Sequence, residues 1–407
     1  MHVLYFHQHF TTPKGASGIR SYQMARALVA RGHRVTMVCG SLYNGATGLV
    51  QPFTNGQRRG LVDGIDVVEF DLNYSNKDGF LRRILVFLKY AIGSIRIALF
   101  GSYDLVFATS TPLTAGIPGI VAKWIRQKPF VFEVRDLWPE LPKQMGVIRN
   151  PVLLAAMSVL EKTAYTSANR CVALSPGIFE GIEKRGIAAK HIAMIPNGCD
   201  LELFSAPSAK PWRPESIPDA NLLAVFTGTH GQANGLDAVL DAARILRQRG
   251  RDDISILLVG DGRLKPALME RANREKLSNV IFHDPIDKAR LACLMMAADL
   301  GLQCLANIPA FYYGTSPNKF FDYAAAGVPV LCNYPGWIAE LIQANNCGYA
   351  VVPEDADAFA GTLEHIAQHK NELSAMSANI QAMAKQNFDR SRLASNWVDW
   401  VVEGRAA

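Results

Sequence analysis

The chain has 407 residues, more than a single hydrophobic core usually holds, so two domains of roughly 200 residues are expected. With 49% hydrophobic and 19% charged residues, its composition is that of a globular protein and excludes a disordered one. Residues 1–200 hold 23 Lys and Arg against 13 Asp and Glu, whereas residues 201–407 hold 19 against 23, so the first half is suited to an anionic partner. Because the basic residues are not clustered with aromatic stacking platforms, we expect no nucleic acid, and a membrane surface or a phosphorylated lipid fits at least as well.

The cysteines and the first residues bear on the cellular compartment. Seven cysteines are scattered without a CxxC pair, which is typical of reduced thiols in a cytosolic protein. The opening MHVLYFHQHF lacks the basic region and apolar stretch of a signal peptide, and no uncharged apolar run is long enough to span a membrane. We therefore expect a cytoplasmic protein, with any association with a membrane being peripheral.

The first half of the chain alternates short apolar strands with helices. Strands are predicted at 2–10, 34–40, 103–110, 129–134, 170–174 and 191–196. Helices are predicted between them at 19–33, 114–126 and 151–167. This alternation is typical of a parallel sheet that is covered on both faces.

A further helix is predicted at residues 80–100. It is largely apolar, but Arg82, Lys89 and Arg96 recur every seven residues and so lie along one stripe. Such a helix can lie at a membrane interface with its basic side chains at the lipid phosphates. Alternatively, it packs on the sheet and leaves a basic edge in solvent.

The alternation restarts after residues 201–220, which contain four prolines and are interpreted as a linker. Strands then follow at 222–228, 254–262, 279–285, 299–305 and 328–333, with helices at about 235–248, 287–297 and from 317. The predicted domains are residues 1–200 and 221–385, and residues 386–407 form a helix that returns to the first domain. The fold class is therefore α/β, with two doubly wound, Rossmann-like domains facing an interdomain cleft. Since ligands bind beyond the carboxyl ends of such strands, this cleft is the expected active site.

The most informative segment is TSPNKFFDYAAAGVPVL at residues 315–331. Ser316, Asn318 and Lys319 lie in a loop that opens a helix, where free N–H groups and the helix dipole favour a phosphate. Lys319 adds a positive charge, and Asp322 could accept hydrogen bonds from sugar or ribose hydroxyls. The alternative is an ordinary capped helix with a solvated Lys–Asp pair.

Glycines and a basic residue follow the first strand. Gly15 and Gly18 permit positive φ and let backbone N–H groups approach a phosphate, although an ordinary surface turn is equally compatible with the pattern. Arg20 could neutralise a diphosphate or lie on the surface of a helix. His7 and His9 share one face at the carboxyl end of the strand and could point toward the cleft.

A second polar cluster follows the strand at residues 129–134. Glu133 and Arg135 share a strand face and could form a structural ion pair, and Asp136 comes directly after them. All three lie at the edge of the sheet where ligands bind.

No metal site is expected. Asp355 and Asp357 form a DxD, but they begin a helix, where acidic residues complement the dipole. His365 and His369 have the spacing of helical metal ligands but lack a third ligand. Gly260 belongs to a Gly-Asp-Gly turn without the third glycine of a dinucleotide fingerprint, and it is interpreted as a donor contact in a tight strand-to-helix turn.

Five stretches together resemble family-4 glycosyltransferases of the GT-B fold. KFFDYAAAGVPVL resembles the segment that the family carries in its carboxyl-terminal domain, and VFEVRDLWPE resembles the acceptor-side segment of a surface-polysaccharide subgroup typified by bacterial fucosamine transferases. The other three are MARALVARGHRVTMVC, IPNGCDLELF and NVIFHDPIDKARLACLMMAADLGL. Their order and their span, nearly the whole chain, support the resemblance.

The resemblance implies a retaining transferase. It would move a sugar, an N-acetylated one from a UDP donor, onto a lipid-diphosphate-linked saccharide at the inner face of the cytoplasmic membrane, in O-antigen or capsule synthesis. Residues 1–200 would bind the acceptor through His7, His9 and Glu133, and residues 221–385 would bind the nucleotide sugar, with His283 near the base. Arg135 and Asp136 become the candidate catalytic residues, and no cofactor or metal is implied.

The chain departs from the family pattern at several positions. The first acid of the usual motif is replaced by Gly314, and Asp322 stands in place of the usual Glu. The Arg and Lys that often grip the diphosphate are replaced by Thr229 and Asn234. A non-catalytic scaffold that binds nucleotide sugars therefore stays an alternative. An NAD-dependent epimerase or dehydrogenase is a second alternative, although the chain lacks both GxGxxG and YxxxK.

Overall fold

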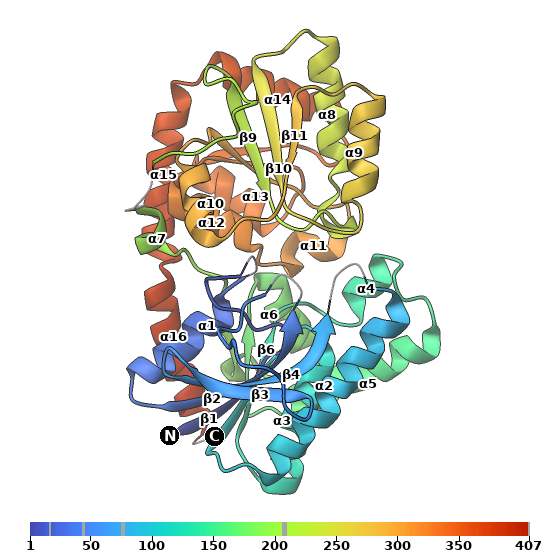
Figure 1. The fold of residues 1–407 in the computed structure, drawn as a ribbon, viewed down its shortest axis with the longest axis vertical. Coiled ribbons are helices and arrows are strands. Elements are labelled where there is room, and N and C mark those ends of the chain that lie inside the picture. The colour runs from blue at the N-terminus through green and yellow to red at the C-terminus, as the bar shows by residue number, and fades with distance from the viewer. Residues whose placement is uncertain (16–17, 43–44, 75–77, 206–209, 406–407) are drawn as a thin grey trace. The chain divides into compact units, whose positions relative to one another are not determined.

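The computed structural model describes residues 1–15, 18–42, 45–74, 78–205 and 210–405 (Figure 1). The chain divides into two compact units, and each consists of a sheet covered by helices. Unit 1 comprises Met1–Asn197, Gly314–Ser316 and Ser391–Ala407, and unit 2 comprises Gly198–Tyr313 and Pro317–Arg390. The predicted fold class, two doubly wound Rossmann-like domains, is confirmed.

Unit 1 contains an eight-stranded sheet in the order β3-β4-β2-β1-β5-β6-β7-β8, parallel except for the β3–β4 pair. The strands are β1 (His2–Phe6), β2 (Arg34–Leu42), β3 (Gln57–Val62), β4 (Ile65–Tyr74), β5 (Leu105–Thr109), β6 (Phe130–Val134), β7 (Arg170–Ala173) and β8 (Ile192–Met194). The β3–β4 hairpin was not predicted. Its signal is Asp63-Gly64, because both residues have positive φ, as a two-residue hairpin turn requires.

The helices of unit 1 lie on both faces of this sheet. They are α1 (Arg20–Ala30), α2 (Phe80–Phe100), α3 (Ile117–Arg126), α4 (Glu140–Gln144), α5 (Pro151–Ser167), α6 (Pro176–Lys184) and α16 (Arg390–Glu403), with short turns η1 (Leu113–Gly116) and η2 (Ala189–His191). In Figure 1, α2, α3 and α5 lie together and α16 lies beside α1. The ring of Trp397 on α16 stacks on Tyr5 and packs edge-on against Phe107, with ring centroids 6.0 and 4.7 Å away. This buried indole explains why the end of the chain belongs to unit 1.

Unit 2 contains a six-stranded, fully parallel sheet in the order β11-β10-β9-β12-β13-β14. Its strands are β9 (Leu222–Thr227), β10 (Ile254–Val259), β11 (Val280–His283), β12 (Leu300–Gln303), β13 (Val330–Cys332) and β14 (Gly348–Ala350). Its helices are α7 (Leu201–Ser205), α8 (Asp237–Gln248), α9 (Lys265–Arg274), α10 (Lys288–Met295), α11 (Pro309–Gly314), α12 (Asn318–Ala326), α13 (Trp337–Ala344), α14 (Ala356–Gln368) and α15 (Glu372–Asn387), with the turn η3 (Gln232–Asn234). The apolar strands form the core because helices cover both of their faces.

Polar side chains fix where several helices begin. Asn150, Ser175 and Asp287 accept hydrogen bonds from backbone N–H groups in the first turns of α5, α6 and α10. Asp355 does the same for α14, and Asp357 pairs with Arg249 at 2.9 Å. The Asp355–Asp357 pair is therefore a helix start, as the sequence predicted.

Candidate active site

In unit 2, glycines bring the loops after β9 and β10 into close contact. Gly228 and Gly260 both have positive φ, and a Cβ on Gly260 would lie 1.8 Å from the carbonyl oxygen of Gly228. A Cβ on Gly262 would likewise meet the backbone of His230 at 2.4 Å. Only glycine fits at these positions, so the two loops meet through their backbones.

Lys319 reaches this glycine loop from the first turn of α12. Its ammonium donates a hydrogen bond of 2.8 Å to Oδ1 of Asn234, whose amide donates to the carbonyl of Thr229 at 2.7 Å. The same ammonium lies 4.8 Å from the centre of the Phe226 ring. Burial lowers the pKa of Lys319 to about 8, so it is charged at neutral pH. The structure thus joins Lys319 to Thr229 and Asn234, the two residues that replace the basic pair of the family.

Asp322, one turn further along α12, has a partner that the sequence did not reveal. Nζ of Lys288, the first residue of α10, lies 2.5 and 2.6 Å from its two carboxylate oxygens. Both side chains are nearly buried, and the burial raises the pKa of Asp322 while Lys288 opposes that shift. The alternative of a solvated pair between Lys319 and Asp322 is therefore wrong, because each has a different partner.

Two buried residues that the sequence analysis missed hold these loops in place. Lys265 donates from Nζ to the carbonyls of Gly260 and His283 and to Oδ1 of Asp284, at 2.9, 3.1 and 2.7 Å. His230 is fully buried, and neither ring nitrogen has a hydrogen-bond partner among the described residues. Burial lowers the pKa of His230 to about 4, with Lys265 adding to the shift. The sequence signal for both residues was their place shortly after a glycine-containing strand end: His230 follows Gly228, and Lys265 follows Gly260 and Gly262.

His283 ends β11 beside an aromatic residue of the segment that was predicted to be a linker. Its ring meets that of Trp212 edge-on at 5.2 Å, and the guanidinium of Arg290 lies 4.0 Å from the centre of the same indole. His283 is thus held at a strand end, as expected for a residue near the base, but a base contact stays a prediction.

The segment at residues 315–331 is divided between the two units. Ser316 belongs to unit 1, where its Oγ accepts a hydrogen bond of 3.0 Å from the backbone N–H of Asn197 and its carbonyl accepts one of 2.6 Å from the Asn197 amide. Asn318 begins α12, and the N-cap residue before it, Pro317, makes no side-chain hydrogen bond to the helix. The N–H groups of its first turn therefore keep their capacity for an anion.

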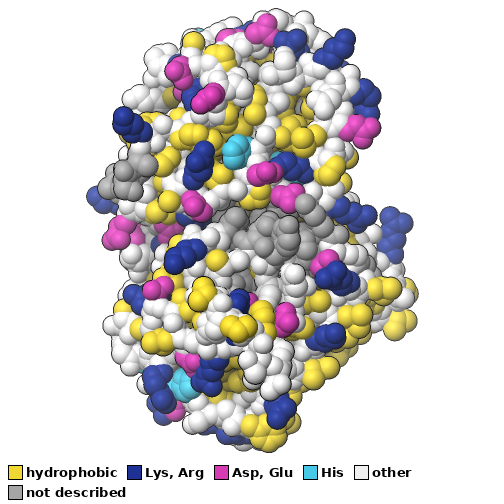
Figure 2. Space-filling view, viewed as in Figure 1, with side chains coloured by type: hydrophobic (Ala, Val, Ile, Leu, Met, Phe, Trp, Pro, Cys, Tyr) yellow, Lys and Arg dark blue, Asp and Glu magenta, His cyan; other side chains and the backbone are white. Residues whose placement is uncertain are grey.

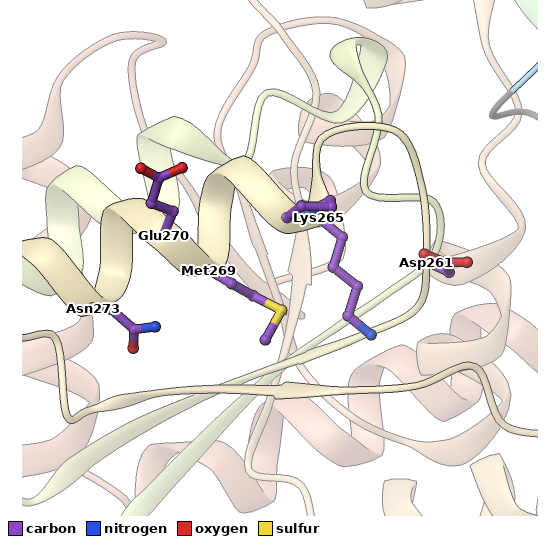
Figure 3. A pocket seen from close by; sticks show the side chains of 6 residues that line it. Asp261, Lys265, Met269, Glu270 and Asn273 are labelled. Atoms are coloured by element: carbon purple, nitrogen blue, oxygen red, sulfur yellow. The ribbon is translucent and has the colours of Figure 1, made fainter.

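A cavity of about 460 Å³ lies along α9 and not over Lys319. It is lined by Asp261, Lys265, Pro266, Met269, Glu270 and Asn273 (Figure 3). In Figure 3, Lys265 extends toward the strand ends, where its ammonium is engaged as described above. With Asp261 and Glu270 as its other charged residues, this cavity does not suit a diphosphate.

In unit 1, Arg20 and Glu133 form a buried ion pair, which corrects two predictions. Nε and Nη2 of Arg20 donate to one oxygen of Glu133 at 3.1 and 2.8 Å, and Arg20 also donates to the carbonyls of Ile195 and Pro196. The other oxygen of Glu133 accepts a hydrogen bond from Thr109 at 2.9 Å. Both charged side chains are 0% exposed. Arg20 is therefore neither a surface residue nor a diphosphate contact, and Glu133 neither contacts the acceptor nor pairs with Arg135.

Just beyond the ends of β1 and β6, Arg135 interacts with His7. Nη1 of Arg135 lies 3.2 Å from Nε2 of His7, which must accept the hydrogen bond because a guanidinium only donates. Burial, together with Arg135, keeps the pKa of His7 well below its usual value, and burial lowers that of His9 to about 3. Both imidazoles are therefore neutral, and the charge at this strand end comes from guanidinium groups, with Arg83 also close enough to affect His9.

Asp136 is half-buried next to Arg135. One carboxylate oxygen accepts a hydrogen bond of 2.7 Å from Oγ1 of Thr111, and burial raises the pKa of Asp136. A carboxylate with a raised pKa is a stronger base, so this position suits assistance to an acceptor hydroxyl.

The glycine loop after β1 lies partly outside the described residues. Gly15 does not have positive φ, contrary to the expectation, but it has no room for a side chain because a Cβ would lie 2.2 Å from Oγ1 of Thr11. Gly18 follows residues 16–17, which are not described. A phosphate contact by this loop stays a prediction.

Within the described residues, no group of three or more His, Cys, Asp or Glu side chains is arranged to hold a metal ion. Among the described helices, none is both long and apolar enough to cross a membrane.

Comparisons with known proteins fit this geometry. Residues 15–198 match the family described as a glycosyl transferase 4-like domain, and residues 221–369 match the family described as glycosyl transferases group 1. No curated protein matches the sequence.

Solved structures share the fold over the whole chain at low sequence identity. Sucrose-phosphate synthase from Thermosynechococcus elongatus is 16% identical, covers 100% of this chain and 99% of its own, and has a TM-score of 0.75. HepE from Anabaena, solved in complex with UDP-glucose, is 19% identical over 99% of this chain and 100% of its own, with a TM-score of 0.69. WaaG, a glycosyltransferase involved in lipopolysaccharide biosynthesis, is 16% identical over 98% and 99%, also with a TM-score of 0.69.

The two parallel-sheet units have the GT-B fold of these solved structures. Both family matches are to glycosyl transferase models, and together they cover most of the chain, so the chain is a glycosyltransferase. Sugar transfer is therefore favoured over the NAD-dependent alternative.

Proposed function

We propose that this protein transfers a sugar, with retention of configuration, from a UDP donor to a lipid-diphosphate-linked saccharide in surface-polysaccharide synthesis. The proposed donor sugar is N-acetylated, as the resemblance of VFEVRDLWPE to the fucosamine-transferase subgroup suggests. The acceptor class agrees with the basic composition of residues 1–200. Such an acceptor is anchored in the membrane, so the enzyme would work at the inner face of the cytoplasmic membrane.

The observation that carries this proposal is the position of Lys319 against the glycine loop. A positive charge, a helix start without a side-chain cap, and a strand end lined by Gly228 and Gly260 together suit a diphosphate. Asp322 lies one turn after Lys319 on α12 and is held by Lys288 of α10, and its carboxylate keeps oxygen lone pairs that could accept hydrogen bonds from ribose or sugar hydroxyls. As the glycosidic bond breaks, Lys319 and the backbone N–H groups would stabilise the charge that develops on the leaving diphosphate.

On unit 1, we assign the acceptor to the strand ends that hold His7, Arg135 and Asp136. Arg135 would orient the acceptor, and Asp136 would accept the proton of the attacking hydroxyl. His9 belongs to the same group. Glu133 would not contact the acceptor, because it forms the buried ion pair with Arg20.

The test is isothermal titration of the protein with UDP, UDP-glucose, UDP-N-acetylglucosamine, GDP and ADP, repeated with Lys319→Met. We expect UDP and its sugars to bind, and the variant to bind them more weakly. Exposed Lys276 offers a matched control, Lys276→Met. Equal affinity of the variant and the wild type for every nucleotide would refute the donor site.

A second candidate function is a non-catalytic scaffold that binds nucleotide sugars. It is favoured by Gly314 in place of the usual acid, and by Thr229 and Asn234 in place of the usual basic pair. Release of UDP from a bound donor sugar, by transfer or by hydrolysis above background, would exclude the scaffold.

A further inference from the structure

Helices α2 and α3 of unit 1 carry an apolar surface in solvent. Six large apolar side chains on this surface are between 45% and 75% exposed. They are Leu81, Leu85, Leu88 and Ile92 on α2 and Trp124 and Ile125 on α3, and we call this surface the α2–α3 face. Exposed apolar patches of this kind mark interaction sites.

The face is built into α2 by two different periodic patterns. Val86, Tyr90, Ala91, Ser94 and Ala98 are buried and pack toward the sheet. Leu81, Leu85, Leu88 and Ile92 are spaced by four, three and four positions, which places them on one line along the opposite side. This helix therefore both packs on the sheet and presents an amphipathic surface, so the two sequence-based interpretations of residues 80–100 are compatible.

A stripe of basic residues runs beside the apolar line. Arg82 and Lys89 each follow an exposed leucine by one position, and Arg96 continues the seven-residue spacing. Lys89 and Arg96 are exposed and form no ion pair with any residue that the structure describes, whereas Arg82 shares its charge with Asp78 at 3.5 Å. Neither α2 nor α3 contains an Asp or Glu. The face is thus apolar on one side and positively charged on the other.

α3, which packs beside α2, carries an exposed aromatic residue. Arg126 at the end of α3 donates hydrogen bonds to the carbonyls of Leu99 and Gly101 at the end of α2, which ties the two helices together. The indole N–H of Trp124 donates to Ser167 at 2.8 Å, yet 62% of the residue is exposed. Figure 2 shows hydrophobic and basic side chains mixed along the edge of the molecule where α2 and α5 lie in Figure 1.

We infer that the α2–α3 face binds the surface of an anionic lipid bilayer. The apolar line would enter the interface, and the basic stripe would lie at the phosphates, as in helices that lie in the plane of a membrane. A second copy of the chain fits less well, because a two-fold contact through this face would bring Lys89 and Arg96 of both copies together without an acidic residue on α2 or α3. The inference extends the proposed function by naming the surface through which the enzyme reaches a membrane-anchored acceptor.

Co-sedimentation of the full chain with vesicles tests the inference without either substrate, so its outcome is independent of sugar transfer. Vesicles of phosphatidylcholine alone are compared with vesicles that also contain phosphatidylglycerol. We expect binding to the anionic vesicles, weakened by added salt. Lys89→Glu/Arg96→Glu should bind roughly thirtyfold or more weakly, since each basic residue near an anionic surface contributes about fivefold. Leu85→Gln/Ile92→Gln should bind about tenfold more weakly.

Matched controls lie elsewhere on the surface. Arg274→Glu/Lys276→Glu makes the same charge change on unit 2, and Leu61→Gln/Val352→Gln makes the same apolar-to-polar change at exposed positions. These variants should bind vesicles like the wild type, and all variants should keep wild-type thermal unfolding. Equal binding of the wild type to neutral and anionic vesicles would overturn the inference. So would a wild-type dimer in size-exclusion chromatography that Leu85→Gln/Ile92→Gln converts to a monomer, because the face would then join two copies.

Discussion

The two units share a doubly wound fold, but their strand ends are built differently. In unit 2, Gly228, Gly260 and Gly262 bring backbone to backbone, and the ammonium groups of Lys319 and Lys265 reach their loops. In unit 1, side chains occupy the strand ends, with Arg135 against His7 above the buried Arg20–Glu133 pair. The backbone N–H groups at the start of α12 suit phosphates, which are common to all nucleotide sugars. Side chains can be varied to select an acceptor. The same fold thus provides a generic half, unit 2, and a selective half, unit 1.

The largest expected effect tests whether Arg20 is structural. Arg20→Met leaves the Glu133 carboxylate buried without its cation, which should cost unit 1 about 3–5 kcal/mol of unfolding free energy. Urea unfolding followed by tryptophan fluorescence measures this loss, with transitions resolved for each unit because a two-domain chain need not unfold in one step. Arg20→Met/Glu133→Leu should recover part of the stability. Unchanged stability with lost nucleotide affinity would instead return Arg20 to the donor site.

The next effect concerns Lys319 and the generic half. Lys319→Met removes a charge-assisted hydrogen bond to the diphosphate and should weaken UDP binding by about 1.5–3 kcal/mol, or roughly ten- to a hundredfold. Because the pKa of Lys319 is lowered to about 8, the wild type should keep its affinity up to that pH and lose it as the ammonium deprotonates above it. The loss should approach about tenfold for each further pH unit, until the pH reaches the higher pKa that Lys319 has in the complex with the diphosphate. Calorimetry from pH 7 to pH 10 measures both effects. A pH-independent affinity in the wild type would show that this ammonium does not contact the diphosphate.

A smaller effect, on the pH dependence of the stability of unit 2, comes from the buried residue His230. Its folded-state pKa of about 4 lies below the ordinary value of 6.5, so the unfolded chain takes up a proton first as the pH falls. The stability of unit 2 should therefore be complete above about pH 6.5 and fall between there and pH 4, by roughly 2 kcal/mol at pH 5. His230→Phe should remove this part of the pH dependence while keeping a ring between Phe226 and Phe282. Identical pH profiles for the variant and the wild type would show that His230 is not the group that titrates.

The sequence predicted most strands and helices because short apolar runs and turn residues are local signals, but it missed the β3–β4 hairpin and β14. It also located Lys319, because a helix start after a Pro-containing loop is a local pattern. It did not predict the partners. Arg20 and Glu133 are separated by 113 positions, and Lys288 and Asp322 by 34, so each pair depends on the register of strands and helices in three dimensions. Charge and position alone made Arg20 a candidate diphosphate contact or a surface residue, and its burial with Glu133 contradicts both.

The smallest expected effect is that of removing divalent ions, for which we expect none. A metal would usually neutralise the leaving diphosphate, but Lys319 and the uncapped start of α12 offer positive charge at that position. Asp355 and Asp357, the metal-binding pattern of another glycosyltransferase fold, cap α14 and pair with Arg249 instead. We therefore expect sugar transfer to continue at an unchanged rate in excess EDTA. Loss of activity in EDTA that Mn²⁺ or Mg²⁺ restores would contradict this, because unit 2 would then recruit a metal with the diphosphate despite its own positive groups.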